Sequence, residues 1–107
     1  MMAVKIIPND RSNQVGKLAD AELHFDDGPL AGLKLIGFGI WERRGGSGQN
    51  VTFPARSFSV NGERRSFSLL RPLDFEPGHE GNQERVRDLI LEAYAEHERT
   101  AEMYDRR

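Results

Sequence analysis

Residues 50–70 read NVTFPARSFSVNGERRSFSLL, and this stretch holds the strongest local structural signal in the chain. Its centre is Asn61-Gly62, a pair that favours a two-residue type I′ turn because both positions tolerate positive φ. The runs on either side, residues 50–60 and 64–70, are therefore predicted to be antiparallel strands. Pro54 interrupts the first run and belongs at an edge or a bulge, because proline has no N–H for a strand ladder.

Upstream of this hairpin, residues 4–7 read as a short strand and residues 17–25 as a longer one. The longer run alternates apolar and polar side chains, which is typical of a strand with one buried face. The glycine-rich tip at residues 45–48 separates two strand-like flanks, residues 33–44 and residues 50–60. These flanks are able to pair, and we expect them to form a long hairpin arm.

Residues 33–44 read LKLIGFGIWERR and carry apolar side chains on both faces of the expected strand. Leu35 and Trp41 fall on one face by simple alternation, and Phe38 and Ile40 fall on the other. Such a strand is covered on both sides, either by a helix and a second layer or by a partner subunit. We predict that Leu35, Phe38, Ile40 and Trp41 form the interface of a homodimer.

From residue 82 the pattern changes to a helical period, and neither proline nor glycine interrupts it before residue 107. Apolar or aromatic residues recur on one side of this helix at Val86, Leu89, Ile90, Ala93, Tyr94 and His97. Strands followed by one helix predict an α+β fold. We expect an antiparallel β-sheet of about five strands with a long hairpin arm and a C-terminal helix packed on the sheet.

The chain has 107 residues, which fits a single domain over residues 1–107. It contains no cysteine, so neither a disulfide framework nor thiolate metal ligation is expected. The apolar stretch near the N-terminus is too short for a signal peptide or a membrane span. We therefore expect a soluble protein in the cytoplasm, without a membrane partner.

The net charge of −2 conceals an uneven distribution along the chain. Residues 33–72 hold seven basic and two acidic side chains, whereas residues 82–107 hold seven acidic and five basic ones. The net charge of the whole chain therefore does not indicate nucleic-acid binding. The excess of basic residues in the strand region, residues 33–72, still does.

Three arginines of this basic region lie on the two strands of the Asn61-Gly62 hairpin, namely Arg56, Arg64 and Arg65. Guanidinium groups bind phosphate through paired donors and stay charged at ordinary pH, which suits contact with a nucleic-acid backbone. We predict that the three converge near one end of the hairpin. The alternative is a solvated hairpin whose charges suppress edge-to-edge aggregation.

Arg43 and Arg44 follow Trp41 at the edge of the glycine tip. A basic arm beside an aromatic ring could hold phosphates while the ring stacks on a base, an arrangement found in single-strand binders. The alternative is that Trp41 is buried in the core or in a dimer interface, since large aromatic residues most often serve burial.

We expect no catalytic residues, metal site, cofactor or small-molecule substrate. The glycine tip lacks the Gly-Lys-Ser/Thr ending of a phosphate-binding P-loop, and Gly37-Phe38-Gly39 lacks the third glycine of a dinucleotide site. His97-Glu98 would begin a zinc-protease motif, but Ala101 occupies the position of the second histidine. An enzyme remains possible only through residues scattered along the chain.

Taken together, the motifs resemble the SpoVG family of small bacterial regulators associated with sporulation and septation. In chain order they are Val4-Lys5-Ile6, Gly16-Lys17-Leu18-Ala19, Leu23-His24-Phe25-Asp26-Asp27, Leu33-Lys34-Leu35-Ile36, Val51-Thr52-Phe53-Pro54-Ala55-Arg56, Asn61-Gly62-Glu63, Phe67, Arg71-Pro72-Leu73 and a closing helix like residues 84–94. No single motif is specific, and the match lies in their order and spacing.

The resemblance implies an α+β fold built on an antiparallel sheet, a dimer formed through strands, and binding of DNA or RNA. Relatives have a basic pair after the proline, whereas here Arg56 is followed by Ser57, so only Arg56 carries over directly. Arg64 and Arg65 could replace the missing charge. The competing hypothesis is a protein-interaction module that uses the apolar strand at residues 33–41 and has no nucleic-acid partner.

Overall fold

The computed structural model describes residues 2–8, 15–43, 48–73 and 81–105. Its elements, in chain order, are β1 (Met2–Pro8), β2 (Lys17–Phe25), the 3₁₀ turn η1 (Gly28–Leu30), β3 (Lys34–Glu42), β4 (Gln49–Thr52), β5 (Ala55–Val60), β6 (Glu63–Ser68) and α1 (Asn82–Asp105). The predicted α+β class, the antiparallel pairing and the C-terminal helix are confirmed.

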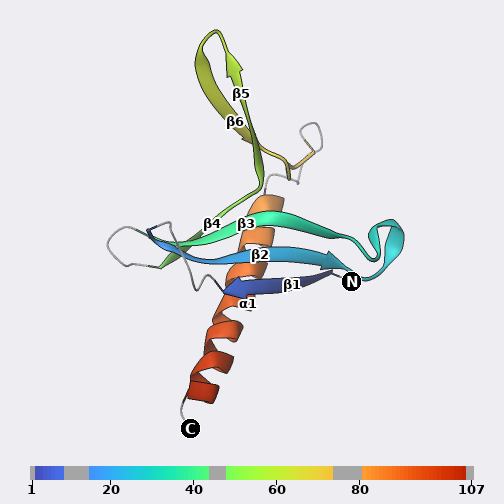
Figure 1. Ribbon diagram of the computed structural model, residues 1–107. Helices are drawn as coiled ribbons and strands as arrows, with labels where there is room; N and C mark the ends of the chain where they lie inside the picture. Colours follow the sequence, from blue (N-terminus) through green and yellow to red (C-terminus); the bar gives the residue numbers. More distant parts are fainter. Residues whose placement is uncertain (1, 9–14, 44–47, 74–80, 106–107) are drawn as a thin grey trace.

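The strands form two separate sheets. One is a four-stranded antiparallel sheet in the order β1-β2-β3-β4, and α1 crosses behind it (Figure 1). The other is the β5–β6 hairpin, here called the arm, which projects away from the four-stranded sheet and the helix (Figure 1). We call the four-stranded sheet and α1 together the body.

The predicted strand over residues 50–60 is in fact two strands that belong to different sheets. β4 ends at Thr52 and β5 begins at Ala55, so the break falls at Phe53 and Pro54. Pro54 cannot donate a ladder hydrogen bond, which explains why the four-stranded sheet ends there. The described residues therefore hold six strands, where about five were expected.

The position of the arm also differs from the prediction. The flanks of the glycine tip pair as β3 and β4 inside the four-stranded sheet, with Gly39 opposite Thr52 and Glu42 opposite Gln49. The strands that project are those joined by the Asn61-Gly62 turn, where φ is 52° and 81°. Positive φ at both residues confirms the predicted type I′ geometry.

The core lies between one face of the four-stranded sheet and α1. Its buried side chains are Ile6, Ala19, Ala21, Leu23, Phe38, Ile40, Val51, Ile90 and Tyr94. On the predicted apolar side of α1, Ile90 and Tyr94 are buried, whereas Leu89 lies at the margin and is 44% exposed. None of the helices in the described ranges is both long and apolar enough to cross a membrane.

A β-bulge in β3 changes which residues face the core. Ala21 lies opposite Phe38 and Leu23 lies opposite Leu35, so β3 has one residue more than β2 in this interval. The extra residue shifts the alternation, and Leu35 falls on the same side as Phe38 instead of on the side of Trp41. Gly37, with φ of 108°, provides the backbone conformation at the bulge.

The bulge bears directly on the predicted dimer interface. Phe38 and Ile40 are fully buried against the chain's own helix, and Leu35 packs against the same core. Phe38 and Ile40 therefore have no exposed surface for a second copy to contact, whereas Leu35 keeps part of its surface exposed. Of the four, only Trp41 lies on the sheet face that α1 leaves open.

Candidate nucleic-acid interface

The arm has two faces of different chemistry, which follow from its register. Residues directly opposite each other in an antiparallel pair lie on the same face. One face, here called the serine face, consists of Ala55, Ser57, Ser59, Arg64, Ser66 and Ser68. The other, here called the aromatic face, consists of Arg56, Phe58, Val60, Glu63, Arg65 and Phe67.

The serine face is polar and carries one positive charge, that of Arg64. Ser59 lies opposite Arg64 and Ser57 lies opposite Ser66, and all four are exposed. Arg64 has no carboxylate partner within the part of the chain that the structure describes. Small side chains let another molecule come close to the hairpin backbone, and each hydroxyl can donate a hydrogen bond to a phosphate oxygen.

The aromatic face combines apolar and charged groups. The rings of Phe58 and Phe67 pack edge to face with their centroids 5.5 Å apart. The guanidinium of Arg65 lies 3.2 Å from a carboxylate oxygen of Glu63, and that of Arg71 lies 6.0 Å from the centre of the Phe67 ring. Phe58 and Phe67 remain 38% and 40% exposed. This face therefore has the character of a contact surface for apolar groups.

The structure places all three predicted arginines on the arm but divides them between its faces. Arg64 lies on the serine face, while Arg56 and Arg65 lie on the aromatic face. Arg64 and Arg65 are neighbours in sequence and therefore point to opposite sides of the strand. The two-residue turn sets Val60 opposite Glu63. Because side chains alternate between the two faces from that pair onward, the sequence was sufficient to predict which arginine lies on which face.

The second predicted basic group does not join the arm. Arg43 follows β3, and its backbone N–H donates to the carbonyl of Gly48 across the β3–β4 turn, at the opposite end of β4 from the arm. Arg44 lies outside the described residues. Trp41 rests on the open face of the sheet, where its Nε1 donates to Thr52 Oγ1 at 2.9 Å. The ammonium of Lys17 lies 5.6 Å from the centre of the indole ring.

Three contacts hold the root of the arm, one within the hairpin and two to the body. The N–H of Leu69 donates to the carbonyl of Pro54 at 2.8 Å, which closes the hairpin at its base. The side-chain amide of Gln83, in the first turn of α1, donates to the carbonyl of Leu70. Pro54 also packs against Gly37, where an added Cβ would lie 2.9 Å from the proline Cβ.

Beside this root lies an open apolar groove of 260 Å³, between the chain that leaves the arm and the first turns of α1. It is lined by Leu70, Arg71, Pro72, Leu73, Asn82, Gln83 and Val86. No pattern in the sequence indicated it, because the strand exit and the helix are joined by a linker whose path the sequence does not specify.

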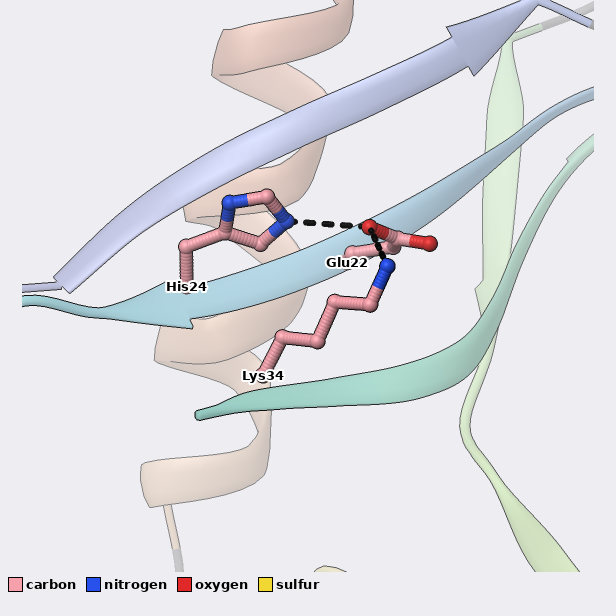
Figure 2. Close-up of polar contacts among 3 residues, drawn as sticks. All are labelled: Glu22, His24 and Lys34. Carbon is pink, nitrogen blue, oxygen red and sulfur yellow. Dashed lines mark hydrogen bonds and ion pairs between the residues drawn. The ribbon is translucent and has the colours of Figure 1, made fainter. Parts of the chain in front are cut away.

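A separate polar cluster lies on the open face of the four-stranded sheet (Figure 2). A carboxylate oxygen of Glu22 lies 2.9 Å from Nε2 of His24 and 3.3 Å from Nζ of Lys34. The hydrogen bond with His24 has the largest effect and lowers the pKa of the Glu22 carboxyl; burial opposes it, and the contacts with Lys34 lower the pKa further. The cluster joins β2 to β3 but holds no surplus charge for a polyanion.

We expect the pKa of Glu22 to rise towards its usual range in a His24→Ala variant, and by less in a Lys34→Ala variant. A lowered pKa stabilises the fold above the usual carboxyl range, and this contribution is lost as pH falls through the lowered value. A ¹³C NMR titration of the Glu22 carboxyl in the wild-type chain and in each variant measures both shifts. If the pKa of Glu22 were the same in both variants as in the wild-type chain, His24 and Lys34 would not be the cause of its lowering.

The sequence matches no protein-family model, and neither the curated proteins nor the solved structures yield a match. The case for a function therefore depends on the arm itself.

Proposed function

We propose that this protein is a cytoplasmic, homodimeric regulator that binds DNA or RNA through the serine face of the arm, and that it acts by binding without catalysis. The observation that carries the proposal is the setting of Arg64, which lies among serines on a projecting hairpin and forms no ion pair with a described carboxylate. The resemblance to SpoVG regulators points to the same partner class.

In this proposal Arg64 binds a phosphate through its paired N–H donors, and the neighbouring serine hydroxyls donate to adjacent phosphate oxygens. A two-stranded ribbon is narrow enough to enter the major groove of a duplex. Arg56, Arg65 and Arg71 add positive potential around the arm, against a single acidic residue between Ala55 and Leu73, namely Glu63. Arg43 contributes charge from the end of the sheet.

Replacement of Arg64 by alanine should weaken binding of a fluorescein-labelled 20-nucleotide DNA or RNA by about tenfold, because each subunit then neutralises one phosphate fewer. The slope of log affinity against log salt should fall by about 1 for each phosphate that is no longer neutralised. Fluorescence anisotropy over a salt series measures both quantities on duplex DNA, single-stranded DNA and single-stranded RNA.

Arg85→Ala is the matched control, since it removes the same charge from an exposed position on α1. The proposal fails if the wild-type chain binds none of the three probes at low salt. It also fails for Arg64 if the Arg64→Ala and Arg85→Ala variants bind equally well.

The second candidate is a protein-interaction module, and the exposed aromatic face of the arm favours it. The strand at residues 33–41 is less suitable for that role, because Phe38 and Ile40 are buried in the body. A protein module predicts that a Phe58→Thr variant loses a heterologous partner in a cross-linking experiment while an Arg64→Ala variant keeps it.

A further inference from the structure

Rings and guanidinium groups alternate on the aromatic face of the arm. The register sets Phe58 directly opposite Arg65 and Phe67 directly opposite Arg56. Directly opposite residues share a face, with Cβ atoms about 5 Å apart. Phe58 and Phe67 meet across the diagonal of this group of four, edge to face, with ring centroids 5.5 Å apart. Each ring therefore has a positive group as its neighbour on the other strand.

This face is open to a ligand. Phe58 and Phe67 are both exposed, and the arm that carries them projects away from the body (Figure 1). The guanidinium of Arg71 lies over the Phe67 ring, whereas no described cation lies over the Phe58 ring. Arg56 forms no ion pair with a described carboxylate. One aromatic ring and one guanidinium on β5, those of Phe58 and Arg56, are therefore available for a partner.

A purely apolar partner would fit this face poorly. It would cover the two rings but would also take Arg56 and Arg65 out of water, and burial of an unpaired charge weakens a complex. A nucleotide supplies both groups that the face requires, a flat base for the ring and a phosphate for the guanidinium. The bases of a duplex are already stacked on each other, so stacking on a side chain requires an unpaired base.

We propose that the aromatic face binds single-stranded nucleic acid, with an unpaired base stacked on Phe58 and a neighbouring phosphate held by Arg56. The two side chains are same-face neighbours along β5, about 7 Å apart. This inference rests on the nucleic-acid binding of the proposed function and names its ligand class. The serine face contacts phosphates, which duplexes and single strands share, so the aromatic face supplies the preference for single strands.

Two probes of equal length and charge separate base stacking from phosphate contact. One is fluorescein-labelled oligothymidylate, and the other carries a tetrahydrofuran in place of every nucleoside, so it keeps the phosphates but has no bases. We expect the wild-type chain to bind oligothymidylate about tenfold more tightly than the abasic strand, the usual scale for one base stacked on an aromatic side chain. Fluorescence anisotropy at low salt measures both affinities.

Substitutions on the aromatic face assign that preference to a side chain. Phe58→Leu should abolish it without changing affinity for the abasic strand or for duplex DNA, because leucine keeps the apolar bulk but has no ring. Phe58→Tyr retains a ring and should retain the preference. Val60→Thr is the matched control, because Val60 is 43% exposed on the same face but has no ring. Arg56→Ala should weaken binding of both strands equally, because both keep their phosphates.

Three results would overturn the inference. The first is equal affinity of the wild-type chain for the two strands. The second is an equal loss on both strands in Phe58→Leu, which would mean that Phe58 supports the arm and contacts no base. The third is tighter binding to vesicles of phosphatidylcholine and phosphatidylglycerol than to either strand, lost in Phe58→Leu, which would assign the face to a lipid surface.

Failure of the proposed function gives a different pattern. If Arg64→Ala binds as tightly as Arg85→Ala while the preference for oligothymidylate persists, the serine face is not the phosphate site and the inference for the aromatic face stands. If Arg64→Ala weakens binding but the wild-type chain does not distinguish the two strands, the proposed function stands and this inference fails.

Discussion

Substitution of Phe38 by alanine should lower the free energy of unfolding by about 3–5 kcal/mol, the usual cost of removing a buried phenylalanine ring. Phe38 is fully buried, and its ring packs edge to face on Phe53 with a centroid distance of 5.2 Å. A chain of this size has a total stability of about 5–15 kcal/mol, so the loss is a large fraction of it. Urea unfolding followed by circular dichroism measures the change.

Ile36→Ala is the control for this experiment. Ile36 lies two residues earlier in β3 but is 57% exposed, so its truncation should cost less than about 1 kcal/mol. Equal losses in the two variants would mean that Phe38 is not in the core and that the position of the β3 bulge is incorrect.

Substitution of Gly37 by alanine should cost about 2–3 kcal/mol and should also displace the root of the arm. Two effects act at this position. The φ of 108° strains any residue with a Cβ, and strain of this kind costs about 1–3 kcal/mol. The new Cβ would also lie 2.9 Å from Cβ of Pro54, which is too close, so the proline and the start of β5 must move.

Gly32→Ala separates these two effects. Gly32 also has a positive φ, of 85°, but an added Cβ there meets no atom within 4 Å. We expect Gly32→Ala to show the strain alone, with no change in the amide NMR shifts of Ala55 to Ser68. If Gly37→Ala costs no more than Gly32→Ala and leaves those shifts unchanged, the contact between Gly37 and Pro54 does not position the arm.

The parts of the fold that were predictable have short-range causes. The Asn61-Gly62 turn depends on the φ preferences of two adjacent residues, and α1 depends on a helical period within a single segment. The β3 bulge depends on how β3 aligns with β2, which local alternation does not contain. One extra residue at the bulge was therefore enough to assign Leu35 to the incorrect face of the strand.

The candidate site was predictable to a similar extent. The basic hairpin could be identified from composition and from its turn, and its arginines do lie on one arm. Its separation from the main sheet could not, because a proline at position 54 is compatible with a bulge, an edge or the end of a sheet. The cluster of Glu22, His24 and Lys34 could not be predicted either. Like the bulge, it depends on how β2 pairs with β3, which the sequence of each strand alone does not specify.

The strands of the arm pair only with each other, so the arm can change in length without altering the four-stranded sheet. One residue inserted in each of β5 and β6 would keep the cross-strand pairs matched but would rotate every pair beyond the insertion to the other side of the ribbon. Two residues inserted in each strand would preserve the orientation of the tip and extend its reach by about 7 Å. Variation in this ribbon should therefore occur in steps of two residues per strand.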